Sequence, residues 1–340
     1  MTISKKQSNG SKVVHGNQEE RKKEEDDGAH RWLRVGTSGW SYKEWEKIFY
    51  PDSKTPKLKF YSSLFNTAEI DSTFYANPTR GLVYGWARNT PEKFKFSVKI
   101  PRSITHDKKL DLAEGAEVEL VKFLDLLRPL NESGKLGPLL IQLPPSFGLS
   151  ARKSLEEFFE ALPKGYSFAV EFRNKSWLRD PKLHSLLHSY GVANTIVDEP
   201  LMPVDTTPTS DEFAFIRWHG RGSRPWYNYL YSSGELDPWV EKIRKISTRV
   251  RSVYGYFNNH FHGNAVENSL EFLEKLGAAS IAQQQELAEI RERRAEGLKN
   301  VLTENDESFI QTGGGQKKKK KMNKRMTPVL EPAQTTLGEF

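Results

Sequence analysis

From residue 32 onward, short apolar runs alternate with longer stretches in which apolar residues recur at helical spacing. This alternation is typical of repeated strand–helix units that form a parallel sheet covered by helices. The apolar runs predict strands at Leu33–Thr37, Thr67–Asp71, Phe94–Lys99, Pro138–Leu143, Ser167–Phe172, Val192–Val197, Phe213–Trp218 and Val253–Phe257.

The stretches between these runs carry the helical periodicity. Eight strands in about 245 residues match the usual size of an α/β barrel of the TIM type, (β/α)8. A doubly wound open sheet is the alternative, because the pattern does not show closure. Residues 198–210 are rich in proline and threonine and are not expected to be helical. Helices are predicted around Pro56–Phe65, Leu82–Arg88, Ala113–Leu130, Ser154–Leu162, Pro181–Tyr190, Pro238–Val250 and Ala265–Leu276.

Composition divides the chain into four segments. Residues 1–30 are charged and polar and predict a disordered tail, whereas residues 31–278 hold the predicted barrel. Residues 279–304 are rich in Gln, Glu and Arg with apolar residues at loosely helical spacing, so a charged surface helix is expected. Residues 305–340 follow as a flexible basic tail that contains a run of three glycines.

The net charge of +7 is unevenly distributed. Residues 1–30 contain equal numbers of basic and acidic side chains, whereas residues 316–326 contain seven Lys or Arg and no acid. The predicted barrel is therefore close to neutral, and an attraction to nucleic acid would be concentrated in the C-terminal tail.

The chain has no cysteine, which excludes disulfides and thiolate metal sites. It has no apolar run long enough for a transmembrane helix, and its first residues are polar rather than an apolar signal sequence. These features predict an intracellular protein, cytoplasmic or associated with DNA, and nuclear if the source is a eukaryote.

Polar and aromatic side chains follow the predicted strands, and the C-terminal strand ends are where TIM barrels carry their functional groups. Aromatic residues in this set could stack on a sugar or an unstacked base. The residues expected to bind substrate are Thr37, Trp40, Tyr42, Asp71, Tyr75, Lys99, His106, Gln142, Arg173, Trp177, Asp198, Arg217, Asn258 and Asn259.

Three residues at these strand ends are candidates for catalysis: Glu69, Glu171 and His219. A carboxylate pair could act as general acid and base, and a histidine beside a glycine could act as a base or ligand. The alternative is that both glutamates are ion-pair partners of Arg173 or Arg217. With Lys99, these arginines could equally form an anion clamp for phosphate or carboxylate.

The cofactor is left open by the sequence. No glycine-rich phosphate loop or nucleophile elbow is present, so a nucleotide cofactor is not indicated. A divalent metal is an alternative, although no short paired ligand spacing supports it and no metal-binding residues are assigned. The side chains available for such a site are His106, His219, His260, His262, Glu69, Glu171 and Asp198.

A series of segments resembles the YecE-like family, called domain of unknown function 72. In chain order they are GTSGWSY, FNTAEIDSTFY, FKFSVKIPRSITH, LGPLLIQLPPSF, AVEFRNKSW, FIRWHG and YGYFNNHFHGNAVENS, and they cover Leu33 to Leu276. The resemblance implies a TIM-type barrel, in agreement with the strand pattern. It implies no activity, because none is settled for the family.

The last residues, Gln334, Leu337 and Phe340, have the spacing Q-x-x-L-x-x-F and resemble the PCNA-interacting peptide. A short helical turn would place Leu337 and Phe340 on one side, where they could enter a hydrophobic pocket of a sliding clamp. The usual form has a second aromatic residue, which this chain lacks. The basic run Lys317–Arg325, made of Lys317–Lys321, Lys324 and Arg325, would contact nucleic acid non-specifically, act in nuclear import or aid solubility.

These observations support three hypotheses of function. The first is an enzyme of the hydrolase or lyase type that acts on DNA or a phosphorylated substrate and is recruited by the sliding clamp. The second is a small-molecule barrel enzyme, acting on a sugar or sugar phosphate, with an incidental tail. The third is a non-catalytic adaptor bound to the clamp.

Overall fold

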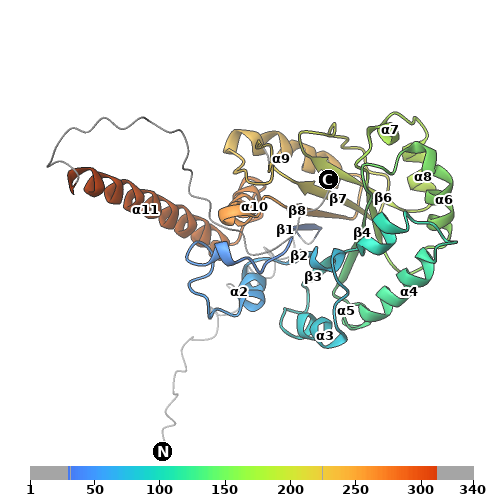
Figure 1. Cartoon of the computed structure of the whole chain (residues 1–340), viewed down its shortest axis with the longest axis horizontal. Coiled ribbons are helices and arrows are strands. Elements are labelled where there is room, and N and C mark those ends of the chain that lie inside the picture. The colour runs from blue at the N-terminus through green and yellow to red at the C-terminus, as the bar shows by residue number, and fades with distance from the viewer. Residues whose placement is uncertain (1–29, 31, 224, 312–340) are drawn as a thin grey trace, which may run out of the picture.

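The computed structural model of the chain describes residues 30, 32–223 and 225–311 (Figure 1). The predicted N-terminal tail, except residue 30, and the predicted clamp-binding residues Gln334, Leu337 and Phe340 lie outside the described residues. The basic segment 316–326 lies outside them as well.

Eight parallel strands form one sheet in the order β1-β8-β7-β6-β5-β4-β3-β2. Between β1 and β2 the ring is closed by a bridge from Ser38 to Glu69 and by a hydrogen bond of 2.8 Å from the Gly39 amide to the Glu69 carbonyl. The predicted TIM-type barrel is therefore confirmed. The strands are β1 (Leu33–Thr37), β2 (Thr67–Ile70), β3 (Lys95–Lys99), β4 (Leu136–Gln142), β5 (Phe168–Glu171), β6 (Ala193–Asp198), β7 (Phe213–Trp218) and β8 (Ser252–Phe257).

Helices surround this barrel, as Figure 1 shows. The segment between β6 and β7 forms no helix, as its proline and threonine content predicts. The α-helices are α2 (Lys57–Leu64), α3 (Arg80–Arg88), α4 (Ala116–Leu126), α5 (Arg128–Glu132), α6 (Arg152–Glu160), α7 (Lys175–Leu178), α8 (Leu183–Ser189), α9 (Ser233–Ser247), α10 (Asn264–Lys275) and α11 (Ile281–Gln311). Short helical turns are η1 (Lys43–Trp45), η2 (Ser72–Phe74), η3 (Ser103–Asp107), η4 (Leu149–Ala151) and η5 (Phe261–Gly263).

Helix α9 begins before the predicted start at Pro238. Ser232 caps it in a capping box: its backbone amide donates to the Glu235 carboxylate at 2.9 Å, and its side chain accepts from the backbone of the first turn. This cap satisfies amide groups that the helix leaves unpaired, so the helix starts at Ser233 and Pro238 lies within it.

Helix α11 continues to Gln311 rather than ending at residue 304, and Figure 1 shows it extending away from the barrel. Its N-terminal half docks on α10. Leu287 and Ile290 are buried, and Arg291 pairs with Glu271 at 3.1 Å. The sequence did not specify this docking face, which places the helix against the barrel wall. Within the described residues, no helix is both long and apolar enough to span a bilayer.

The barrel interior changes from apolar to charged along its axis. A core of aliphatic and aromatic side chains fills it, namely Leu140, Ala169, Ala193, Phe213, Phe215, Tyr254 and Tyr256. The Tyr256 hydroxyl lies 2.7 Å from the Thr67 hydroxyl and 2.8 Å from the Ser97 hydroxyl, which forms a polar layer. Charged groups lie beyond this layer, at the C-terminal strand ends.

Candidate active site at the barrel mouth

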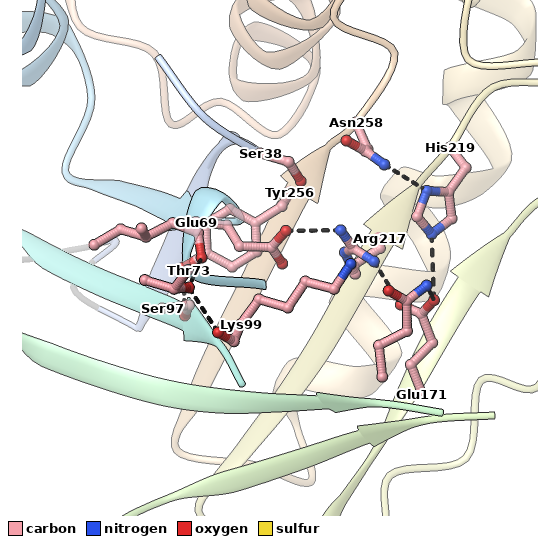
Figure 2. Close-up of polar contacts among 12 residues, drawn as sticks. Ser38, Glu69, Thr73, Ser97, Lys99, Glu171, Arg217, His219, Tyr256 and Asn258 are labelled. Atoms are coloured by element: carbon pink, nitrogen blue, oxygen red, sulfur yellow. Dashed lines mark hydrogen bonds and ion pairs between the residues drawn. The ribbon is translucent and has the colours of Figure 1, made fainter. Parts of the chain in front are cut away.

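Arg217 is the centre of the charged layer (Figure 2). It projects inward from β7 and is buried, with one guanidinium nitrogen 2.7 Å from Glu69 Oε1 and another 2.8 Å from Glu171 Oε2. Because β2, β5 and β7 supply these three residues, the ion pairs connect distant strands across the barrel. Burial acts to lower the pKa of Arg217, but the two carboxylates outweigh it and raise that pKa.

Glu171 is held as a carboxylate by two arginines. Its Oε1 lies 2.5 Å from Arg173 and accepts a hydrogen bond of 3.1 Å from Gln142, while Arg173 also pairs with Glu199. Burial acts to raise the pKa of Glu171, but Arg173 and Arg217 outweigh it and hold that pKa well below its ordinary value. Glu171 therefore resists protonation, which suits an electrostatic role better than proton transfer.

His219 is a neutral imidazole in this arrangement. Its Nε2 lies 3.0 Å from Arg173 and its Nδ1 lies 2.9 Å from the Asn258 side-chain amide. Burial, Arg173 and Arg217 lower the pKa of His219 to about 3. Arginine and the Asn258 amide nitrogen are both donors, and a neutral imidazole accepts at only one nitrogen. Either Asn258 turns its carbonyl oxygen toward a protonated Nδ1, or Nε2 carries the proton and faces Glu171 Oε1 at 3.7 Å. The accepting nitrogen of His219 is thus already engaged.

Glu69 differs from Glu171 in having a free oxygen. Its Oε1 contacts Arg217, whereas its Oε2 is buried and has no hydrogen-bond partner of ordinary geometry among the described residues; the nearby Ser38 hydroxyl, also without such a partner, acts to lower the pKa of Glu69. Burial and the neighbouring Asp71 raise the pKa of Glu69, against the effect of Arg217. A carboxyl with a raised pKa and an unused oxygen can exchange protons with a bound molecule.

Lys99 enters the mouth from the end of β3. Its ammonium lies 3.8 Å from the centre of the Phe74 ring, and the Thr73 hydroxyl fixes the strand end by donating to the Lys99 carbonyl at 2.6 Å. Burial and the charge of Arg217 lower the pKa of Lys99 to about 8, although Glu171, Asp71 and Glu69 oppose the shift.

Aromatic side chains form the rim of the mouth. Tyr75 is 60% exposed, and Tyr42 stacks on His260 with ring centres 4.5 Å apart. His106 lies edge-on to Phe74 at 4.9 Å, and burial together with Lys99 and Arg102 lowers its pKa to about 4. Tyr75 therefore offers an exposed ring face to a ligand, and His106 adds no positive charge at neutral pH.

The structure thus brings together most of the predicted site, and it adds Glu199, which the sequence analysis did not include. Glu199 follows β6 and contacts Arg173 from the irregular segment that leads to β7. Nothing in the local pattern marks it, because its position depends on how that segment folds back. The predicted residues that converge are Glu69, Lys99, Gln142, Glu171, Arg173, Arg217, His219 and Asn258, with Tyr42, Asp71, Tyr75 and His106 around them.

Three predicted residues point from the strand ends into the helix layer instead of the mouth. The Thr37 hydroxyl lies 3.0 Å from the Tyr61 hydroxyl of α2, and Asp198 accepts from Trp239 of α9 at 2.9 Å. Asn259 donates to Asn268 of α10 at 2.8 Å. Successive side chains alternate across a strand, so these positions face away from the interior.

Two predicted tryptophans pack instead of lining an open site. Trp177 is fully buried and donates to the Phe147 carbonyl at 2.8 Å, so it belongs to the core around α7. Trp40 packs on Trp86 and Phe96, with ring centres 6.1 and 5.6 Å away. Both were expected to bind substrate, and their contacts with neighbouring rings give them a packing role instead.

The ligands considered for a metal do not converge. Among the residues that the structure describes, no group of three His, Asp or Glu side chains is arranged to hold a metal ion. Glu69 and Glu171 each contact Arg217 in place of a shared cation, and Asp198 accepts from Arg221 at 2.9 Å in the helix layer. The charged layer thus neutralises its carboxylates with protein cations.

Comparison with known proteins finds a family of similar sequences. The family described as "Protein of unknown function DUF72" matches residues 34–292. The UPF0759 protein YunF of Bacillus subtilis is 27% identical over 268 residues, which cover 72% of this chain and 94% of that protein. The UPF0759 protein YecE of Escherichia coli is 29% identical over 170 residues, or 49% of this chain and 59% of that protein.

Solved structures of the same kind superpose on the barrel. A DUF72 family protein from Thermotoga maritima is 34% identical with a TM-score of 0.65, covering 72% of this chain and 99% of the other. A DUF72 family protein from Enterococcus faecalis is 26% identical with a TM-score of 0.62, covering 73% and 98%. The family resemblance expected from the sequence motifs is confirmed.

Proposed function

Since this chain belongs to the DUF72 family, whose match spans the barrel and its charged mouth, we propose that it is a small-molecule enzyme. The reaction proposed is proton transfer beside a carbonyl group of a sugar or a related polyhydroxylated compound. Such a step underlies isomerases and the lyase chemistry expected from the sequence.

One observation carries this proposal: two ionisable groups of opposite type are shifted in opposite directions at the same mouth. Burial raises the pKa of Glu69 and lowers that of Lys99 to about 8, so both pKa values shift toward neutral pH. Pairs of groups with environments of this kind commonly divide the acid and base roles of a reaction. The Oε2 atom of Glu69 can accept the proton that is removed from the substrate.

The charge pattern favours a small, largely uncharged substrate over a phosphodiester. Arg217 and Arg173 each contact two carboxylates, so neither has its charge free for a phosphate. Exposed ring faces at the rim, such as Tyr75, suit the apolar face of a sugar. The hydrolase hypothesis for DNA lacks a comparable basic surface on the near-neutral barrel.

Glu69→Gln is expected to lower proton exchange by about 10²–10⁴-fold, the usual contribution of general acid–base catalysis. The protein is incubated in D2O with aldoses, ketoses, dihydroxyacetone and D-glyceraldehyde, and loss of the C–H signal beside the carbonyl is followed by NMR. Glutamine keeps an acceptor for Arg217, so the fold should survive the change.

The matched control is Glu241→Gln, which alters an exposed glutamate of α9 that pairs with Arg244. It should leave exchange unchanged. If no compound in the panel exchanges faster with the protein than without it, the proposed function is wrong. If Glu69→Gln exchanges as fast as the parent protein, Glu69 has no part in the reaction.

We also propose that the tail recruits the barrel to a PCNA-type sliding clamp, on the basis of the Q-x-x-L-x-x-F spacing of Gln334, Leu337 and Phe340. The neighbouring lysine run would strengthen the attraction to DNA at low salt. This proposal concerns location and is independent of the reaction at the barrel mouth.

Leu337→Ala/Phe340→Ala is expected to weaken clamp binding by about 10²-fold or more, because each buried anchor is worth about 1.5–3 kcal/mol. Binding of the full-length protein to purified clamp is measured by calorimetry. A variant with Thr335→Ala and Thr336→Ala, between the anchors, is the control and should bind like the parent. Equal binding by parent and anchor variant would contradict recruitment.

A further inference from the structure

Lys99 stands apart from the other cations of the mouth because no carboxylate holds it. Arg173 and Arg217 are each shared by two glutamates. The Lys99 ammonium contacts the Phe74 ring, and among the described residues it has no hydrogen-bond or ion-pair partner. Its side chain is only 9% exposed. A buried lysine without a polar partner calls for an explanation beyond stability.

The surroundings orient this amine toward the reacting region. Figure 2 shows the Lys99 side chain extending from β3 toward Arg217, in the same layer as Glu69. Thr73 holds the end of the strand by its hydrogen bond to the Lys99 carbonyl, and the following residue, Phe74, supplies the ring beneath the ammonium. The nitrogen is therefore fixed on an apolar surface and points to the centre of the mouth.

We propose that Lys99 forms a covalent imine with the carbonyl group of an aldehyde or ketone substrate. This inference rests on the proposed function, because it names the group that would receive the electrons when a proton is removed beside the carbonyl. It assigns Lys99 as a catalytic residue and restricts the substrates to compounds with a free carbonyl.

The reaction balances without a further reactant. The neutral amine of Lys99 attacks the carbonyl carbon, a C–N bond forms, and the carbonyl electron pair moves to oxygen, which takes a proton from protonated Glu69 and leaves Glu69 as a carboxylate. The resulting carbinolamine loses water as the C=N bond forms, and a proton stays on nitrogen. That iminium draws electrons from the neighbouring C–H bond, whose proton passes to the Glu69 carboxylate and leaves a neutral enamine. Glu69 then returns a proton to a carbon of the enamine, which restores the iminium. Hydrolysis with one water releases the product, gives a proton back to Glu69 and restores the neutral lysine.

The electrostatics support an amine that reacts at neutral pH. A lysine with a pKa of about 8 is neutral in about a tenth of the molecules at pH 7, whereas an ordinary lysine is almost wholly charged. Lysines buried in apolar pockets or placed beside another cation are activated in this manner. Here the apolar surface is Phe74 and the second cation is Arg217.

Lys99 could instead be a simple counter-ion for Glu69, Asp71 and Glu171, since all three raise its pKa. The two roles predict different results for Lys99→Arg. Arginine keeps the positive charge, so a counter-ion role would be preserved. Arginine cannot form the imine, so a covalent role would be lost.

The test traps the imine by reduction. The full-length protein is incubated with dihydroxyacetone or D-glyceraldehyde and treated with sodium borohydride, and the adduct is located by mass spectrometry of its peptides. Adduct is expected at Lys99 in the parent protein and at background level in Lys99→Arg. Lys135 is the internal control, because it is also buried but donates to the Ala87 and Thr90 carbonyls at 2.6 and 2.7 Å.

Proton exchange in D2O is measured on the same protein and compounds before borohydride is added. The proposed proton transfer and the proposed Lys99 imine can then be contradicted independently. Exchange without a Lys99 adduct, or exchange that persists in Lys99→Arg, overturns the imine and leaves the proposed function standing. An adduct shared equally by Lys99 and Lys135 also overturns it. If neither exchange nor adduct is found with any compound, both proposals are wrong.

Discussion

Replacing Arg217 by methionine is expected to destabilise the barrel by about 3–5 kcal/mol, the usual cost of removing one partner from a buried ion pair. Glu69 and Glu171 would then lie in the interior without the cation that now contacts both. Unfolding in urea at pH 7, followed by circular dichroism, measures the loss. The surface variant Arg244→Met is the control, because its pair with Glu241 is exposed and should contribute at most about 1 kcal/mol.

The cause can be separated from lost packing by two further measurements. Without Arg217 the pKa of both carboxyls rises in the folded state, so the variant should recover part of its deficit as the pH falls from 7 to 5. Combining Arg217→Met with Glu69→Gln and Glu171→Gln should recover stability at pH 7 for the same reason. A deficit that is equal at both pH values and unchanged in the combined variant would point to packing instead of charge.

Acid is expected to destabilise the protein through His219. The pKa of His219 is about 3 in the folded barrel, whereas an unfolded histidine titrates near about 6.5. Between these values the unfolded chain binds a proton that the folded chain does not. Stability is therefore complete above about pH 6.5 and falls with decreasing pH, by up to about 1.4 kcal/mol per pH unit from this residue.

His219→Gln is expected to remove this contribution. The difference in unfolding free energy between parent and variant, measured in urea at pH 7, 6, 5 and 4, should change by up to about 1.4 kcal/mol at each step. Glu171 adds its own loss at lower pH, and His219 helps to lower its pKa, so the comparison is read between pH 7 and pH 5, above the range in which Glu171 titrates. The exposed His188 of α8 is the control, and His188→Gln should leave the pH dependence unchanged. Parallel curves for the parent and His219→Gln would show that the histidine is protonated in the folded state too.

The fold could be predicted because each strand and helix is marked by the spacing of apolar residues within its own segment of the sequence. Two of the predicted strands, Leu33–Thr37 and Phe213–Trp218, have the observed bounds, and the others differ by only a few residues. The docking face of α11 was not predicted, because it depends on Arg291 and Arg294 reaching Glu271 and Glu267 of α10, and the periodicity of α11 alone does not contain these contacts.

The site could have been predicted more closely by applying strand alternation to every strand end. On β7 and β8, Phe215 and Tyr256 lie in the inner core, so Arg217 and Asn258 face inward as well. The same count directs Asn259 outward, where it bonds to α10. Strand alternation cannot predict the position of Glu199, because this residue lies beyond the end of β6. It also cannot predict which charged side chains form ion pairs. Whether Glu69 or Glu171 has an oxygen atom without a partner depends on how side chains from β2, β3, β4, β5 and β7 meet at the mouth.

The bridge between Ser38 and Glu69, which completes the ring between β1 and β2, carries a consequence for catalysis. The backbone of Glu69 forms this join, while its side chain is the proposed proton carrier. Any transient separation of β1 and β2 at this bridge would move the Glu69 carboxyl relative to Arg217 and Lys99. Glu69 therefore links the closure of the ring to the alignment of the reacting groups, while Tyr61, whose hydroxyl bonds to both Thr37 and Thr67, supports the same join.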